Sequence, residues 1–258
     1  MTNYKKSLSS IYYFFNIHRW YLAIKDPGFA LREIVAILKH PVLFIIISKV
    51  EGKISNWEGV LLYRTVLKSK HSSKNIVEVG AFKGLSTVYL ARAAQTIGKR
   101  VKSFELFSGL PTSDLLLDPN FQTGKFSSEV SEYDNNLRAC GVRDIVDLVI
   151  GDARQTMLPS LALTGFSVAF LDVDVYEVMR ELLPQLWSIA QGNELILVHD
   201  IWSPGVRKAI DEFHALSGNA IKEVDLIKGP KGTIAILTLP PKIEPTRLRN
   251  YSQNILYP

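Results

Sequence analysis

The stretch "NIVEVGAFKGLSTVYLARAA", residues 75–94, decides the fold. A short run rich in Val and Ile is followed by two glycines and then by a helical sequence, the order of a strand, a ligand-binding loop and a helix. Glu78 stands where a dinucleotide-binding loop has its first glycine. We expect Gly80 and Gly84 to let a ligand approach the backbone, and a negative group of the ligand to lie at the start of the helix near Leu85.

Strand-like and helical segments alternate from Ile76 onward. The strand-like runs are "NIVEVG", "RVKSFEL", "IVDLVIGD", "FSVAFLDVD", "ELILVHD" and "TIAILTL". This alternation predicts an α/β fold, a Rossmann-like doubly wound and mostly parallel sheet. Only "KGPKG" separates "IKEVDLI" from "TIAILTL", which is the length of a hairpin connection. We therefore expect the last strand to be antiparallel.

The two ends of the chain differ from this pattern. Residues 1–70 hold 11 Lys and Arg against 4 Asp and Glu, a charge of +7, while the whole chain carries +5. We predict three parts: an N-terminal helical cap or interface segment (1–70), the α/β domain (71–240) and an extended tail (241–258). This segment also contains the aromatic stretch "IYYFFNIHRWYLAIK". We favour a homo-oligomer interface or cap for it, because its basic residues do not by themselves indicate a membrane surface: such residues occur on any solvated helix face. The alternative is a peripheral contact with an anionic membrane.

Composition excludes several classes of protein. The chain has 258 residues, of which 47% are hydrophobic and 21% charged, so a globular fold is expected. Cys140 is the only cysteine, which excludes an internal disulfide and favours a cytoplasmic location. No signal peptide is expected, and "PVLFIII" is far shorter than the ~20 residues of a spanning helix. No basic groove pattern accompanies the loop at Glu78, so no nucleic-acid partner is expected.

Acidic residues at three strand ends indicate the ligand. A ligand with an ammonium and a carboxylate suits both Glu78 and the helix start, where Ser86 lies, and S-adenosylmethionine (SAM) has that pattern. Glu105 ends the second strand 21 residues after Gly84, where an acid binds ribose hydroxyls. Asp152 follows the third strand, within reach of an adenine amino group. Each acid alone is equally a solvated strand end. A nicotinamide dehydrogenase is disfavoured because Glu78 replaces a glycine.

A second acidic group follows the fourth and fifth strands. In "FLDVDVYE", Asp172 and Asp174 are two residues apart and point to one side if the chain stays extended. Asp174 is alternatively the N-cap of the next helix, with Glu177 completing a capping box. Asp200 is not needed as a cap, because Ser203 precedes the following helix. These acids are therefore candidates for chemistry.

Taken in order, the motifs "EVGAFKG", "ELFSGLP", "LDVDVY" and "HDIWSPGVRKAIDEF" resemble those of class I SAM-dependent methyltransferases. In detail the chain resembles the macrocin O-methyltransferase family over about residues 50–237. The resemblance implies methyl transfer from SAM to a hydroxyl of a sugar-containing metabolite or glycan. It also implies that Asp172 and Asp200 ligate a divalent ion, usually Mg²⁺, and that Asp174 is the general base.

One position departs from the macrocin pattern, which commonly has Asp-Asp where this chain has His199-Asp200. Imidazole is a poorer partner for Mg²⁺ than a carboxylate. His199 is a third metal ligand, an alternative general base or an outer residue that orients a ligand. Equally, it is a histidine that only bonds the backbone at the strand end. A non-catalytic scaffold that binds SAM is the alternative function, and intact Asp172, Asp174 and Asp200 argue against it.

The segment between the second strand and the next helix, residues 108–126, is polar and irregular. We interpret it as a substrate lid, with an ordinary mobile surface loop as the alternative. Tyr176 and Trp202 follow the two acidic motifs. They either stack on the acceptor or pack against the sheet.

Overall fold

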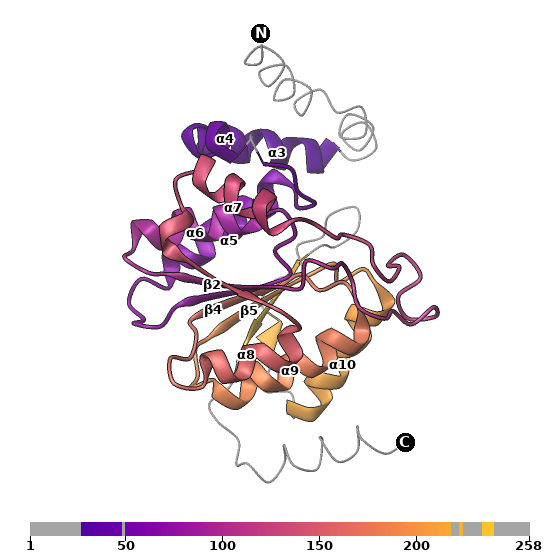
Figure 1. The fold of residues 1–258 in the computed structure, drawn as a ribbon. Coiled ribbons are helices and arrows are strands. Elements are labelled where there is room, and N and C mark those ends of the chain that lie inside the picture. Colours follow the sequence, from indigo (N-terminus) through magenta and orange to yellow (C-terminus); the bar gives the residue numbers. More distant parts are fainter. Residues whose placement is uncertain (1–26, 48–49, 218–221, 224–233, 240–258) are drawn as a thin grey trace.

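The computed structural model describes residues 27–47, 50–217, 222–223 and 234–239, which form a single twisted sheet between two layers of helices (Figure 1). The strands are β1 (Ile76–Val79), β2 (Val101–Glu105), β3 (Val146–Ile150), β4 (Val168–Leu171), β5 (Leu195–His199), β6 (Lys222–Glu223) and β7 (Ile234–Thr238). Their order is β3-β2-β1-β4-β5-β7-β6. The first five pair in parallel, β7 runs antiparallel to β5, and β6 runs antiparallel to β7. The predicted fold class and antiparallel last strand are confirmed.

The helices divide between the two faces of the sheet (Figure 1). They are α3 (Pro27–Lys39), α4 (Pro41–Ile47), α5 (Asn56–Lys68), α6 (Leu85–Thr96), α7 (Val130–Ala139), α8 (Ala153–Leu161), α9 (Tyr176–Ile189) and α10 (Pro204–Ser217). One core cluster joins the sheet to α4, α5, α6 and α7, and the other joins it to α8, α9 and α10. Both faces are thus covered, as a parallel sheet requires.

The central strands β1 and β4 are buried at every position. The chain leaves β1 toward β2 on one side, and β4 leads to β5 on the other, so the strand order reverses between β1 and β4. Ligands of open α/β sheets bind beyond the carboxyl ends of the strands at such a reversal. The strand order therefore makes the loop after β1 the expected place of a binding site, in agreement with the expectation from the sequence.

The predicted boundary at residue 70 does not separate two cores. Leu62 and Val66 of α5 are fully buried in the same cluster as Ile76 and Val88 of the α/β domain. The helix starts with a capping box, which the spacing of Ser55 and Glu58 in the sequence predicts. The hydroxyl of Ser55 accepts a hydrogen bond from the backbone N–H of Glu58, and the carboxylate of Glu58 accepts one from the backbone N–H of Ser55. α5 is thus an integral part of the domain.

Other predictions for the chain ends lie outside the described residues. These include the aromatic stretch 11–25, the hairpin connection "KGPKG" and the tail 241–258. Within the described part, no helix has the length and apolarity needed to span a bilayer. Helix α8 was not predicted, since its short sequence carries Pro159 in the helix interior and little amphipathic pattern.

Candidate active site

A cavity opens at the carboxyl ends of the parallel strands, with about 1070 Å³ of empty space including its mouth. The predicted site residues that line it are Gly80, Ser86, Glu105, Asp152, Asp172, Asp174, His199 and Asp200. They come from the ends of β1 to β5 and the first turn of α6. The structure thus brings together four of the six residues predicted for cofactor binding and all of those predicted for chemistry.

The structure corrects the predicted role of Glu78 in ligand binding, because Glu78 does not line this cavity. It lies inside β1, is fully buried, and its Oε2 accepts hydrogen bonds from Thr87 Oγ1 (2.6 Å) and Ser103 Oγ (2.9 Å). Burial raises the pKa of this carboxyl to about 7, against the hydrogen bonds that lower it. Glu78 therefore joins β1, β2 and α6 under the cavity floor instead of facing a ligand's ammonium group.

The two loop glycines also have structural causes. Gly80 has φ +88°, and a Cβ there would lie 1.9 Å from the carbonyl oxygen of Asp172, so no side chain fits between β1 and β4. Gly84 has φ +91° at the N-cap of α6, with Tyr133 of α7 3.2 Å from an added Cβ. Gly84 does not line the cavity, and close packing is sufficient to explain both glycines.

The remaining cofactor candidates are already hydrogen-bonded. Glu105 accepts three backbone N–H bonds, from Phe82 (2.6 Å), Leu106 (2.7 Å) and Phe107 (3.0 Å). These bonds use most of the lone-pair positions of the carboxylate and fix the loops after β1 and β2. Asp152 caps α8 through the N–H of Arg154 and pairs with its guanidinium, which holds the pKa of Asp152 below its usual value.

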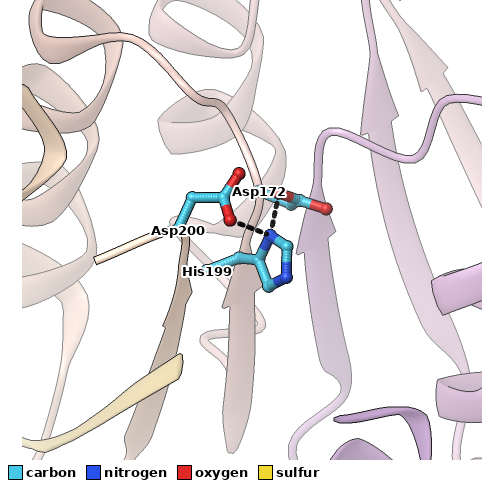
Figure 2. A group of neighbouring side chains, drawn as sticks. All are labelled: Asp172, His199 and Asp200. Carbon is cyan, nitrogen blue, oxygen red and sulfur yellow. Dashed lines mark hydrogen bonds and ion pairs between the residues drawn. The ribbon is translucent and has the colours of Figure 1, made fainter. Parts of the chain in front are cut away.

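The acids after β4 and β5 form what we call the acidic cluster: Asp172, Asp174, His199 and Asp200. Nδ1 of His199 lies 2.8 Å from Oδ1 of Asp172 and 3.4 Å from Oδ1 of Asp200. Figure 2 marks both contacts with dashed lines. Asp174 lines the same cavity and interacts electrostatically with Asp172 and Asp200. Asp174 and Asp200 have φ +62° and +52°, a left-handed conformation that is strained for residues other than glycine. The backbone is thus held in an unusual form to bring these side chains together.

The acidic cluster has perturbed protonation equilibria. Burial and the carboxylates of Asp172 and Asp200 raise the pKa of Asp174 well above its usual value. Burial alone would lower the pKa of His199, but the neighbouring carboxylates outweigh it and raise it well above its usual value. Perturbed groups of this kind in a cavity indicate a functional site.

The donor set fits a divalent cation. One possible ligand atom from each of Asp172, His199 and Asp200 lies within 4.8 Å of the others, two oxygens and one nitrogen. Negative charge is also in excess here, since three carboxylates surround one imidazole. A cation would offset this charge.

Sequence reasoning missed the contribution of the chain before β1. Gly52, Lys53 and Ile54 line the cavity, and buried Glu58 of α5 approaches His199, with Oε1 3.5 Å from Nε2. The sequence identified Glu58 only as a member of a capping box. A second role for its Oε1 has no signal in local sequence, because the approach to His199 depends on how α5 packs.

The segment 108–126 is anchored as well as exposed. Leu115 and Leu116 are each 87% exposed, whereas Asp118 and Phe121 are buried. Oδ1 of Asp118 accepts the N–H of Tyr176 (3.0 Å) at the start of α9. The mobile-loop alternative therefore does not describe the whole segment, and its role as a lid stays a prediction.

Two alternatives for residues after the acidic motifs are settled by these contacts. Asp174 is not the N-cap of α9, since Val175 occupies that position without a side-chain bond. Tyr176 and Trp202 do not line the cavity. The hydroxyl of Tyr176 lies 2.7 Å from Glu212, and Trp202 donates to Asp200 (2.8 Å), so both side chains make contacts within the fold.

Comparisons with known proteins agree with this fold. Residues 77–201 match the family model described as "Methyltransferase domain". The chain therefore contains a methyltransferase domain with the class I fold, as its motifs predicted; the macrocin-type subfamily stays a prediction. The comparison with curated protein sequences found no match.

Solved structures with this fold include three methyltransferases. The calicheamicin methyltransferase CalS11 is 20% identical (TM-score 0.58), with 70% of this chain and 77% of that chain covered. The O-methyltransferase NovP is 18% identical (TM-score 0.59; 71% and 79% covered). TomG, an O-methyltransferase from Streptomyces achromogenes solved in complex with SAM, is 19% identical (TM-score 0.54; 74% and 82% covered). At these identities the likeness concerns the fold.

Proposed function

We propose that this protein is a SAM-dependent O-methyltransferase that methylates a hydroxyl of a sugar-containing metabolite or glycan. The observation that carries the proposal is that four of the predicted cofactor residues and the acidic cluster line one cavity. The matching methyltransferase domain supports SAM as the methyl donor. NovP and TomG are O-methyltransferases, which supports oxygen as the acceptor atom. The sugar rests on the resemblance to the macrocin family.

The cofactor binds in the half of the cavity formed by the ends of β1, β2 and β3. Ser86 and the first turn of α6 offer backbone N–H groups and a positive helix end to the methionine carboxylate. Glu105 and Asp152 line the same half, at the positions for ribose and adenine. Both carboxylates are held by other bonds, so this half is preorganised before the cofactor arrives.

Asp174 is the general base in the other half. Its raised pKa makes the ionised carboxylate a stronger base than an ordinary aspartate, so it accepts the proton of the acceptor hydroxyl more readily. The hydroxyl oxygen then forms a bond to the methyl carbon, and the bond from that carbon to sulfur breaks. The products are the methyl ether, S-adenosylhomocysteine and a proton on Asp174.

A divalent ion is part of the proposal, with Asp172, Asp200 and His199 as the residues that would hold it. When bound, such an ion lowers the pKa of a hydroxyl that contacts it. The carboxylates of the cluster orient the acceptor, and the buried walls exclude water from the reacting atoms.

Calorimetry with SAM, followed by an assay for S-adenosylhomocysteine with a panel of glycosides and catechols, tests the function. We expect the protein to bind SAM and to form S-adenosylhomocysteine with at least one hydroxyl acceptor. Binding without product for any acceptor in the panel would favour the non-catalytic scaffold. Absence of SAM binding would refute both.

A further inference from the structure

The proposed function leaves open which ion the cluster takes and what orients His199. Resting on that function, we propose that the site takes a transition-metal dication such as Mn²⁺ or Zn²⁺ through Asp172, Asp200 and Nδ1 of His199. In the same proposal, Glu58 on α5 is the positioning residue that turns His199 toward this ion.

The three candidate ligand atoms have the spacing of ligands that share one ion. Nδ1 of His199 lies 2.8 Å from Oδ1 of Asp172 and 3.4 Å from Oδ1 of Asp200, and Figure 2 shows the three side chains converging. Two adjacent ligands with bonds of about 2.1 Å at right angles lie about 3 Å apart. A cation at this point therefore needs small movements of side chains and no rearrangement of the fold.

The nitrogen donor determines which ion is preferred. Mg²⁺ takes oxygen ligands almost exclusively and is bound weakly by imidazole. Affinity for mixed nitrogen and oxygen sites rises along the series from Mn²⁺ toward Cu²⁺, and imidazole suits Zn²⁺ and iron. With His199 in place of an aspartate, the cluster therefore favours a transition-metal ion over Mg²⁺.

The second ring nitrogen of His199 faces Glu58. Nε2 is buried without a hydrogen-bond partner among the described residues, and Oε1 of Glu58 lies 3.5 Å from it. A histidine that ligates a metal commonly donates its other ring N–H to a carboxylate, which fixes the tautomer and the ring orientation. Glu58 stabilises the proton on Nε2 and leaves the lone pair of Nδ1 directed at Asp172 and Asp200.

The carboxylate of Glu58 is held in place by the start of its own helix. Its Oε2 accepts hydrogen bonds from the N–H (2.7 Å) and the hydroxyl (2.6 Å) of Ser55, which leaves Oε1 toward His199. Gly59 lies against Tyr89 of α6, where an added Cβ would be 2.2 Å from the ring. This close packing of α5 on α6 brings the adjacent Glu58 to the end of β5.

Glu58 is 3% exposed, so it is not a solvated surface acid that happens to lie near the cavity. It also lies outside residues 77–201, the part that matches the methyltransferase family model. The positioning residue is thus supplied by the N-terminal part of the chain. Burying another carboxylate beside Asp172, Asp174 and Asp200 adds to the negative charge that a dication would offset.

Titration calorimetry of the full chain with MnCl₂, ZnCl₂ and MgCl₂ tests both parts. We expect Mn²⁺ and Zn²⁺ to bind at least about tenfold more tightly than Mg²⁺, and Glu58→Gln to weaken Mn²⁺ binding about 10- to 100-fold. Spin-echo spectroscopy of bound Mn²⁺ should detect a directly coordinated nitrogen in the wild type, and this signal should be lost in His199→Asp.

Glu177→Gln on α9 is the matched control, because it makes the same chemical change on a side chain that is 44% exposed and does not line the cavity. It should bind Mn²⁺ within about threefold of the wild type. Tighter Mg²⁺ binding, no nitrogen signal, or unchanged Mn²⁺ binding in Glu58→Gln would overturn the proposal. SAM affinity, measured in the same samples, reports separately on the proposed function: ion binding without SAM binding would refute only that function.

Discussion

The carboxylates in the two halves of the cavity have different hydrogen-bond partners and different burial. On the β2 and β3 side, Glu105 and Asp152 are bonded to backbone N–H groups or to Arg154. On the β4 and β5 side, Asp174 and Asp200 lie close to each other and to Asp172, and burial raises the pKa of both residues. In our proposal, the acids bonded to the backbone or to an arginine form the binding surface, whereas the acids buried close to one another provide the proton acceptor and the cation site.

Glu78 gives a third case, an acid that has no part in the cavity. It lies on the central strand β1, which helices cover on both faces, and hydroxyl groups bond it. Glu78 shows that the depth of an acidic residue in the sheet must be known before a role can be assigned to it. The following predictions test the contrast between these acidic residues, in decreasing order of expected effect.

Asp174→Asn should lower turnover by about 10²- to 10⁴-fold, because asparagine cannot accept the proton. SAM affinity should stay near that of the wild type, since the change lies in the other half of the cavity. Steady-state kinetics and calorimetry measure the two quantities. Asp211→Asn, on the exposed surface of α10, is the control and should change neither. Unchanged turnover in Asp174→Asn would transfer the role of base to another residue, with His199 as the first candidate.

Glu78→Gln should flatten the dependence of stability on pH. The folded pKa of Glu78, about 7, lies above its ordinary 4.5, so the native state holds the proton longer than the unfolded state. Wild-type stability should therefore fall as pH rises from 4.5 through 7, by on the order of 3 kcal/mol at about 1.4 kcal/mol per pKa unit.

Urea unfolding at several pH values between 5 and 8 measures this loss. The variant should lack it, while Glu177→Gln on α9, whose side chain is 44% exposed, should retain it. An identical pH dependence in Glu78→Gln and the wild type would show that Glu78 is ionised in the folded protein at low pH.

Glu105→Gln should weaken SAM binding about tenfold, because one amide oxygen cannot accept the three N–H bonds that the carboxylate accepts. The effect on turnover at saturating SAM should be smaller than that of Asp174→Asn. Calorimetry and kinetics on the two variants separate the halves. A loss of turnover with normal SAM affinity in Glu105→Gln would contradict the division.

Much of the fold could be predicted from local sequence. The Val- and Ile-rich runs identified the strands, the short connection before the last strand indicated its direction, and Ser55 with Glu58 marked the start of α5. The acidic cluster was predictable too, since the ends of parallel strands meet at one edge of the sheet.

What the sequence did not predict depends on tertiary packing. The inward position of Glu78 follows from the cover on both faces of β1, and an acid in an apolar run carries no mark of it. The approach of Glu58 to His199 depends on the contact of Gly59 with Tyr89. Asp118, from the segment interpreted as a lid, supplies the acceptor at the start of α9 that the sequence assigned to Asp174.

A crystal structure of the complex with S-adenosylhomocysteine is the most direct measurement of the central claim, one cavity with a binding half and a reacting half. The account predicts the nucleoside against Glu105 and Asp152, with the sulfur facing Asp174. A ligand bound elsewhere, or bound with its sulfur turned away from the acidic cluster, would contradict it.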